Sequence, residues 1–381
     1  MTGPRVVVVG ASLAAVTAVG ALRRLGHDGP ITLLGDEPHG PYTRPPLSKG
    51  VLSGAEASES VLLPAFGDDI DIRLGVRAAG LDVTNRRVLV DGGEQVPYDR
   101  LVIATGARAR TLGHSGEVVL RNLDDAVALR DALARRPRVV VVGAGFLGLE
   151  IASACRGLGL EVTVVDREPP LVTSLGPFLA DLVAAAAHDH GVRILVSPGG
   201  VQLLGARSLT GVRLADGREL TADLVVTAVG CRPNIEWLEG SGIAGAGGIA
   251  VDDRGRVRPD IVAAGDVAAF PGAGGPRRTP HWSSAIDQAG VAAATLLHGD
   301  VAAAYTPAPY FWTEAFGLTI KVSGPLPARG EPTVSAGSVD DRSALLQWPV
   351  PGGGSVVAAV NHKISVAKLR RMAVAEPLPH P

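Results

Sequence analysis

A short segment that occurs twice constrains the fold of this chain more than any other feature. Residues 5–15 read RVVVVGASLAA, and residues 138–148 read RVVVVGAGFLG. In each copy an Ala-rich stretch and a Leu-Gly pair follow, and then comes a second apolar run, ITLLGDE at 31–37 or EVTVVDRE at 161–168. A strand, a glycine-containing turn, a helix and a second strand make a βαβ unit, whose apolar strands belong in a parallel sheet covered on both faces. The sequence therefore predicts two βαβ units of one design.

The composition of the 381 residues indicates a large folded core and excludes several functional classes. Hydrophobic residues make up 46% and charged residues 19%, which excludes a disordered chain, and a formal net charge of −2 excludes a strongly basic nucleic-acid surface. Two cysteines, Cys155 and Cys231, are too few for a disulfide framework or a cysteine zinc site. The uncharged run between Arg5 and Arg23 is shorter than the ~20 residues of a membrane span. We therefore expect a cytoplasmic protein without a membrane segment, and the scattered histidines predict no metal site.

The turn of the second copy has the complete spacing of a dinucleotide-binding loop. Gly143 permits the sharp turn, Gly145 lets a pyrophosphate touch the backbone, and Gly148 lets the helix pack closely on the strand. The phosphate then lies at the positively polarised start of the helix. Asp166 ends the second strand, where a carboxylate binds a ribose 2′-hydroxyl and favours NADH. The neighbouring Arg167 is the alternative, because an arginine there accommodates the 2′-phosphate of NADPH.

The turn of the first copy departs from this spacing. Gly10 keeps the first position, but Ser12 and Ala15 replace the second and third glycines. Alanine is tolerated at the third position, whereas a side chain at the second crowds a pyrophosphate. The serine hydroxyl is small and is able to donate a hydrogen bond. A turn without a ligand is therefore the alternative interpretation of this copy.

Further apolar runs extend the two units and predict a third domain. We expect buried strands within 98–110, 222–234 and 258–270, a helix over 286–298, a strand over 310–324, a hairpin around 351–354 and a helix ending at 371. The predicted fold class is α/β, with two Rossmann-like dinucleotide-binding domains and a small α+β C-terminal domain. The predicted boundaries are 1–111 with 231–307 for a discontinuous first domain, 112–230 for an inserted second domain, and 308–381 for the third.

Seven short motifs, in order along the chain, resemble those of one family. They are PYTRPPLSK (41–49), ATG (104–106), GCRPN (230–234), AAGDVA (263–268), HW (281–282), PYFW (309–312) and VNHK (360–363). In order and spacing the chain resembles the FAD-containing NADH–ferredoxin reductases of the putidaredoxin-reductase and ring-hydroxylating-dioxygenase-reductase type. The resemblance implies a glutathione-reductase-like architecture, with an FAD domain, an inserted NAD domain and a C-terminal domain.

The resemblance also implies which residues bind FAD. Gly10, Ser12 and Ala14 would hold its pyrophosphate, and Asp36, or the neighbouring Glu37, would bind the adenosine ribose. The other implied cofactor-binding residues are Arg44, Ala78 through its backbone at the adenine, Arg121 on the phosphate or adenine side, Gly265 and Asp266 at the ribityl chain, Trp282 through its backbone at the flavin ring, and Trp312 beside that ring.

Two catalytic residues are implied as well. Lys49 would lie near the isoalloxazine ring, and Glu150 would be the acid that pairs with it. The chain has only four lysines among its 36 basic residues, so a lysine after PPLS indicates a compact point charge rather than a planar guanidinium. Such a charge stabilises an anionic reduced flavin. The alternative is an ordinary surface lysine.

The implied activity is electron transfer from NADH through FAD to a ferredoxin-type iron–sulfur protein that serves a monooxygenase or dioxygenase. We expect no nucleic-acid or membrane partner. An acidic ferredoxin needs a basic surface, for which the sequence offers Arg277, Arg278, Lys363, Lys368, Arg370 and Arg371.

Other functions are alternatives to ferredoxin reduction. A disulfide or peroxide reductase needs a cysteine near the flavin, and residues 36–60 contain none. A non-enzymatic nucleotide sensor would account for three departures from the family pattern. Ser12 and Ala15 replace glycines of the first turn, and Pro280 stands where the family usually has glutamate. A diaphorase or oxidase would pass electrons to small acceptors or to oxygen.

Overall fold

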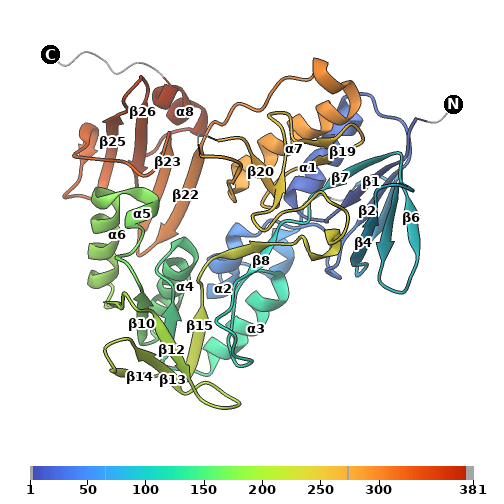
Figure 1. Cartoon of the computed structure of the whole chain (residues 1–381). Helices are drawn as coiled ribbons and strands as arrows, with labels where there is room; N and C mark the ends of the chain where they lie inside the picture. The colour runs from blue at the N-terminus through green and yellow to red at the C-terminus, as the bar shows by residue number, and fades with distance from the viewer. Residues whose placement is uncertain (1–2, 65, 273, 375–381) are drawn as a thin grey trace. The chain divides into compact units, whose positions relative to one another are not determined.

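The computed structural model describes residues 3–64, 66–272 and 274–374, which form two compact units (Figure 1). The first unit comprises Met1–Thr43, Val61–Arg108 and Arg232–Pro307. The second unit comprises Arg44–Ser60, Ala109–Cys231 and Ala308–Pro381. The division into three domains stays a prediction, and residues 375–381 of its third domain lie outside the described residues.

A six-stranded sheet organises the first unit. Its strands in spatial order are β18 (Arg256–Arg258), β19 (Ile261–Ala263), β7 (Arg100–Ile103), β1 (Val6–Val9), β2 (Ile31–Leu34) and β3 (Ile70–Arg73). All neighbouring pairs are parallel except β18 with β19.

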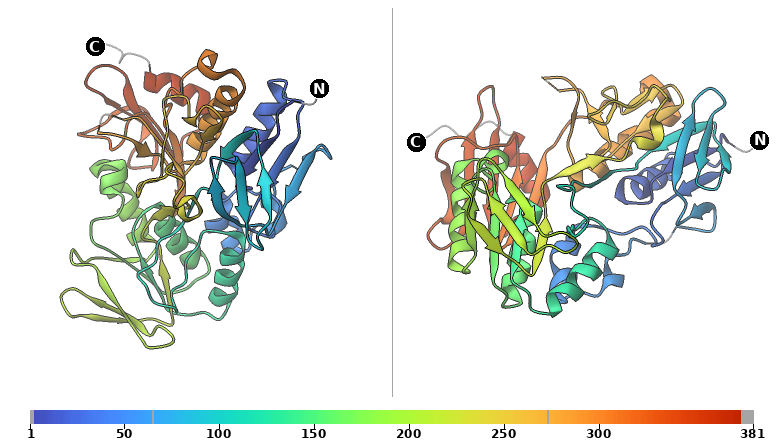
Figure 2. Two further views of the ribbon diagram at one scale, coloured as in Figure 1. Left: turned by 45° about the vertical axis from the view of Figure 1, so that its right-hand side comes forward. Right: turned by 60° about the horizontal axis from the view of Figure 1, so that its bottom comes forward.

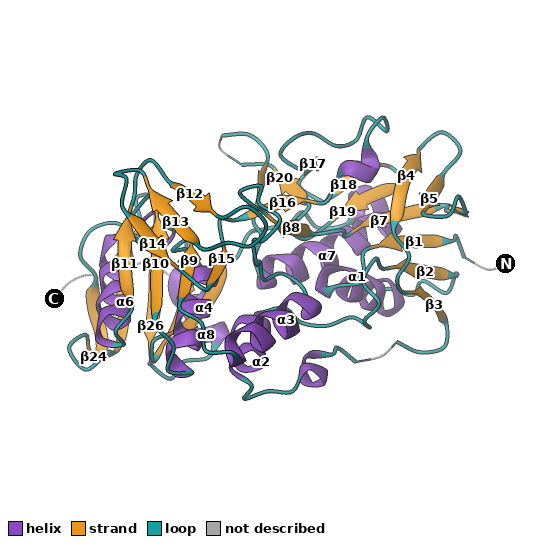
Figure 3. Cartoon of the chain, turned by 90° about the horizontal axis from the view of Figure 1, so that it is seen from below, coloured by secondary structure: helices purple, strands orange, loops and turns teal. Residues whose placement is uncertain are grey.

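Both faces of this sheet are buried, as the unbroken valine run predicts. Val6 and Val8 face α1 (Leu13–Arg24) and α7 (Trp282–His298), which pack side by side (Figure 3). Val7 and Val9 face a second core. Residues of two further sheets belong to that core. One is the antiparallel sheet of β4 (Ala78–Asp82), β5 (Arg87–Val90) and β6 (Gln95–Pro97). The other is formed by β17 (Ile249–Ala250), β20 (Ala268–Phe270) and β21 (Arg277–Arg278).

The second unit repeats the βαβ arrangement. Its parallel sheet runs β11 (Arg193–Val196), β10 (Val162–Asp166), β9 (Val139–Val142), β15 (Leu224–Thr227). An antiparallel sheet of β12 (Val201–Leu204), β13 (Gly211–Leu214) and β14 (Glu219–Thr221) shares a hydrophobic core with this sheet. The helices of the second unit include α2 (Gly50–Ser53), α3 (Leu123–Ala134), α4 (Phe146–Gly157), α5 (Val172–Leu175) and α6 (Pro177–Asp189). The chain passes between the units at β8 (Ala107–Ala109) and β16 (Cys231–Pro233).

The same ion pair holds the first strand of each copy to a neighbouring strand. Arg5, just before β1, donates from its backbone nitrogen and its guanidinium to Asp99, just before β7. Arg138, before β9, makes the same three bonds to Asp223, before β15. The repeat seen in sequence is therefore a repeat of structure, and the predicted α/β fold class is confirmed.

An antiparallel sheet ends the second unit, in the order β22 (Tyr310–Ala315), β23 (Leu318–Ser323), β26 (Ser355–Val360), β25 (Ser343–Pro349), β24 (Thr333–Ser338). Figure 2 shows this red-brown sheet from two further sides. The prediction of one strand over 310–324 is wrong, because Phe316 and Gly317 take positive φ values of 54° and 71° and reverse the chain into a β22–β23 hairpin. The hairpin around 351–354 is confirmed. Helix α8 (Val366–Val374) continues past residue 371, and α7 begins before residue 286.

Candidate functional site

In the first unit, the loops after β1 and β19 meet at the carboxyl edge of the parallel sheet. Gly10 has φ +112°, and a Cβ on it would lie 2.2 Å from the carbonyl oxygen of Ala104, so only glycine fits. A Cβ on Gly265 would lie 3.0 Å from the Cβ of Ala14, at the first turn of α1. Gln288 of α7 accepts a hydrogen bond of 3.0 Å from the Gly265 amide. The Gly265-Asp266 loop is therefore held against the start of α1.

The start of α1 and the end of β2 provide polar groups at the same edge. Ser12 is the N-cap of α1, yet its hydroxyl makes no capping hydrogen bond. Gly35 lies so close to the turn that a Cβ on it would be 2.5 Å from the Cβ of Ala11. Beyond Gly35, Asp36 is exposed, whereas Glu37 accepts a hydrogen bond from the hydroxyl of Tyr42.

Ala78 and Trp282 also belong to the first unit. The amide of Val76 donates to the Gly35 carbonyl over 2.8 Å, which brings the segment leading into Ala78 beside the end of β2. Trp282, 39% exposed, begins α7 and donates from Nε1 to the hydroxyl of Thr43 over 3.1 Å.

One arginine of the predicted docking set supports the Gly265-Asp266 loop. Arg278 donates from its guanidinium to the backbone carbonyl of Asp266 over 2.9 Å, and a Cβ on Gly248 would meet the Arg278 side chain at 2.8 Å. Arg277 is exposed. Burial lowers the pKa of nearby His281, an effect that the charge of Asp266 opposes. Arg278 therefore has a structural contact that the sequence did not reveal.

In the second unit, the three glycines after β9 have different surroundings. Gly143 has φ +114°, and a Cβ on it would lie 2.3 Å from the Ala228 carbonyl oxygen. A Cβ on Gly148 would lie 1.9 Å from the Gly143 carbonyl oxygen. A Cβ on Gly145 would meet no protein atom within 4 Å. Packing therefore accounts for the first and third glycines but not for the second, whose bare backbone suits a ligand.

Asp166 lies at the end of β10, beside this turn. Its Oδ2 accepts from the amide of Ala144 over 2.5 Å, and its Oδ1 accepts from the amide of Arg167 over 2.6 Å. These two bonds fix the carboxylate at the edge of the sheet, next to the open Gly145.

Lys49 and Glu150 form an ion pair within the second unit. The Lys49 ammonium lies 2.8 Å from Oε2 of Glu150 and donates to the carbonyl of Pro45 over 3.1 Å. Glu150 is 7% exposed and accepts from the hydroxyls of Ser48 over 2.5 Å and Thr313 over 2.8 Å. The sequence had no signal for the two hydroxyl contacts, since Thr313 is 163 positions away from Glu150.

The remaining predicted residues also lie in the second unit. Arg44 donates from Nη1 to the carbonyl of Arg121 over 2.7 Å, so these two are neighbours. Trp312 of β22 stacks on Tyr310, with 6.1 Å between ring centroids. The predicted cofactor residues thus fall into two groups, each assembled within its own unit, and their roles stay predictions.

Both cysteines are free thiols. Cys155 is buried, and burial raises its pKa to about 12, whereas Cys231 is half-buried. No cluster of potential metal ligands occurs among residues 3–64, 66–272 and 274–374. Across that same part of the chain, no helix is both long enough and apolar enough to cross a bilayer.

Sequence comparisons agree with this geometry. A family model described as "Pyridine nucleotide-disulphide oxidoreductase" matches residues 4–289. The biphenyl dioxygenase system ferredoxin–NAD(+) reductase component of Paraburkholderia xenovorans is 35% identical over 367 residues, covering 93% of this chain and 90% of that protein. The anthranilate 1,2-dioxygenase system ferredoxin–NAD(+) reductase component of Burkholderia cepacia is 35% identical over 398 residues, covering 100% and 97%.

Solved structures extend the likeness to the fold. The ferredoxin reductase for the CYP199A2 system from Rhodopseudomonas palustris superposes with a TM-score of 0.86 at 33% identity, covering 94% of this chain and 91% of that one. The covalent putidaredoxin reductase–putidaredoxin complex gives a TM-score of 0.86 at 28% identity, covering 98% and 93%. The chain thus has the architecture of these reductases over nearly its whole length.

Proposed function

Because the chain belongs to the pyridine nucleotide-disulphide oxidoreductase family, we propose that it is an FAD-dependent NADH:ferredoxin reductase. Electrons would pass from NADH through FAD to an iron–sulfur protein that serves a monooxygenase or dioxygenase. The observation that carries the proposal is the pair of parallel sheets, in each of which a glycine turn of positive φ leads from a strand into a helix, together with the open backbone at Gly145 in the second turn. We further propose that the protein acts in the cytoplasm.

The first unit supplies groups that suit the pyrophosphate, ribose and ribityl parts of FAD. The uncapped start of α1 offers backbone amides and the Ser12 hydroxyl to the pyrophosphate. Asp36 suits the adenosine ribose better than Glu37, because Asp36 is exposed beyond the end of β2, whereas Glu37 is half-buried against Tyr42. Asp266 suits the ribityl hydroxyls, since its loop is held at the start of α1.

The second unit supplies the corresponding groups for NADH. The open backbone at Gly145 accommodates the pyrophosphate, and the fixed Asp166 carboxylate accepts from the ribose hydroxyls. A 2′-phosphate at that place would be repelled by Asp166, which favours NADH over NADPH. The names of the two ferredoxin–NAD(+) reductase relatives support the same preference.

Lys49 and Glu150 are the proposed catalytic pair. When bound, the nicotinamide and the flavin supply the hydride and electron chemistry. The protein's part is to hold a positive charge, the Lys49 ammonium, in a fixed place by means of Glu150 and the Pro45 carbonyl. A fixed charge costs no reorganisation at the moment of reaction, so it stabilises developing negative charge more than a mobile one.

The proposed partner is an acidic ferredoxin-type protein. The relatives are reductase components of dioxygenase systems, and one similar structure is a complex with putidaredoxin. Exposed candidates for its docking are Arg277, Lys363, Lys368 and Arg371. Arg370 lies over the Tyr310 ring, and Arg278 binds a backbone carbonyl, so both also have structural contacts.

Three measurements on the purified protein test the proposal. We expect a visible flavin spectrum with about one FAD per chain, bleaching of that spectrum by NADH under anaerobic conditions, and reduction of an added ferredoxin. Ferredoxin turnover should fall as salt rises, whereas turnover with a neutral quinone should not. A colourless protein that takes up no FAD would favour the nucleotide sensor, and a protein that reduces only oxygen or quinones would favour the oxidase or diaphorase.

A further inference from the structure

We propose that Thr313 is a positioning residue, through which strand β22 fixes the Glu150 carboxylate and thereby the Lys49 ammonium. The inference rests on the proposed function, because it assigns Thr313 a part in that catalysis. It concerns three residues that the second unit holds in hydrogen-bond contact.

Each oxygen of the Glu150 carboxylate has its own donors. Oε2 accepts from the Lys49 ammonium over 2.8 Å and from the Ser48 hydroxyl over 2.5 Å. Oε1 accepts from the Thr313 hydroxyl over 2.8 Å. Ser48 and Lys49 are adjacent in the chain, so they move together and hold only one side of the carboxylate. Thr313 is the donor that fixes its other oxygen, and with it the rotation of the group.

Strand β22 is well placed to do this, because it packs along one face of α4. Phe311 contacts Phe146 with 4.1 Å between ring centroids, Thr313 bonds Glu150, and the amide of Phe316 donates to the Ser153 hydroxyl over 2.8 Å. Positions 146, 150 and 153 have the spacing of one helix face. Residues 311 and 313 share one face of β22, as the period of two requires.

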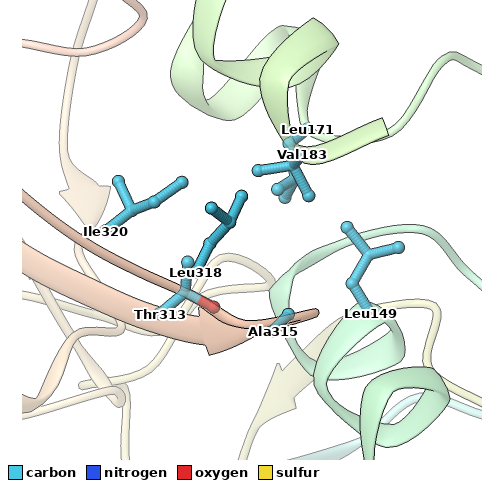
Figure 4. Close-up of a pocket in the computed structure, with 7 residues that line it drawn as sticks. All are labelled: Leu149, Leu171, Val183, Thr313, Ala315, Leu318 and Ile320. Carbon is cyan, nitrogen blue, oxygen red and sulfur yellow. The ribbon is translucent and has the colours of Figure 1, made fainter. Parts of the chain in front are cut away.

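Thr313 is buried, and one side of it faces apolar side chains. Figure 4 shows Thr313 among the apolar side chains that line a small cavity beside α4. The cavity has no room for a water molecule. The lining residues other than Thr313 are Leu149, Leu171, Val183, Ala315, Leu318 and Ile320. If the Thr313 hydroxyl is removed, water from this side cannot replace its bond to Oε1.

Four variants separate positioning from simple packing. Thr313→Val keeps the shape and removes the hydroxyl, and Thr313→Ser keeps the hydroxyl. Ser153→Ala is the matched control, because it removes a hydroxyl on the same helix face that accepts from the Phe316 amide and makes no hydrogen bond to Glu150 or Lys49. Glu150→Gln removes the negative charge that holds the Lys49 ammonium, so that in this background the orientation of side chain 150 no longer fixes that ammonium.

We expect Thr313→Val to slow flavin reduction at saturating NADH by about tenfold, since one hydrogen bond to a charged group is worth roughly that much. The flavin midpoint potential should become more negative, by about 30 mV for each tenfold fall in the equilibrium constant of its two-electron reduction. In Thr313→Ser and Ser153→Ala the rate of flavin reduction should stay within about twofold of that of the unmutated protein. In the Glu150→Gln background, Thr313→Val should not slow flavin reduction further.

Equal effects of Thr313→Val and Ser153→Ala, or a full effect of Thr313→Val in Glu150→Gln, would overturn the proposal. Unfolding of the apoprotein in urea gives a second test, which needs no flavin. The costs of Thr313→Val and Glu150→Gln should be non-additive there, because the residues are in contact; additive costs would overturn the contact itself. If NADH does not reduce the flavin of the unmutated protein, the proposed function is refuted. The urea measurements on the two single variants and the double variant can still be interpreted in that case.

Discussion

Replacing Gly145 by alanine tests whether the turn after β9 is kept open for a ligand. Gly145 has φ −75° and ψ −177°, a conformation that alanine adopts without strain, and the added Cβ would meet no protein atom within 4 Å. A glycine-to-alanine change at such a position stabilises a protein by about 0.4–1 kcal/mol, because it restricts the unfolded chain. We therefore expect the Tm of the apoprotein to stay the same or to rise by roughly 1–3 °C.

The same methyl group would stand where, in the proposed function, the NADH pyrophosphate meets the backbone. Loss of one hydrogen bond to a charged group costs about 1.5–3 kcal/mol, which is roughly a 10- to 150-fold loss of kcat/KM for NADH. FAD content should not change, since this turn belongs to the second unit and the turn proposed to bind FAD belongs to the first. Steady-state kinetics with an artificial acceptor and thermal unfolding of the apoprotein measure the two effects separately.

Gly148→Ala is the matched control. Its Cβ would lie 1.9 Å from the Gly143 carbonyl oxygen, so the helix must shift, and overpacking of this kind costs about 1–3 kcal/mol. This variant should lower the Tm, whereas Gly145→Ala should not. If both variants lose stability equally, the space at Gly145 is not open. If Gly145→Ala leaves kcat/KM for NADH intact, the pyrophosphate does not approach this glycine.

Three further predictions concern other parts of the molecule. Asp166→Ala should narrow the preference for NADH over NADPH, because it removes the charge that repels a 2′-phosphate; an unchanged ratio of kcat/KM values would assign the discrimination elsewhere. Burial and the nearby Arg charges lower the pKa of His27 in the folded protein. Below about pH 6.5 the unfolded chain therefore binds more protons than the folded one, and the free energy of unfolding falls as the pH is lowered, by at most about 1.4 kcal/mol per pH unit. His27→Gln should therefore flatten the pH dependence of urea unfolding, and a slope equal to that of the unmutated protein would contradict this. Arg277→Gln should slow only ferredoxin turnover. Arg278→Gln should weaken FAD binding, because it breaks the hydrogen bond from Arg278 to the Asp266 carbonyl. Loss of FAD in both variants, or in neither, would refute this difference between the two arginines.

The sequence by itself determined the features that depend on local pattern. Runs of four valines after Arg5 and Arg138 predict buried parallel strands, and the glycine after each run predicts a tight turn, because only glycine adopts the positive φ found there. The hairpin around 351–354 was predictable for the same reason. These patterns work because the period of a strand and the conformational freedom of glycine belong to neighbouring residues.

Only the tertiary structure decided which distant groups meet. The hydroxyl of Thr313 reaches Glu150 across 163 positions, and the guanidinium of Arg278 reaches the carbonyl of Asp266 across a hairpin. Local alternation also misled at 310–324, where it predicts one strand, because apolar periodicity continues through the turn at Phe316 and Gly317. A hydrogen bond between separate elements depends on how their faces pack, and no spacing within either segment specifies that packing.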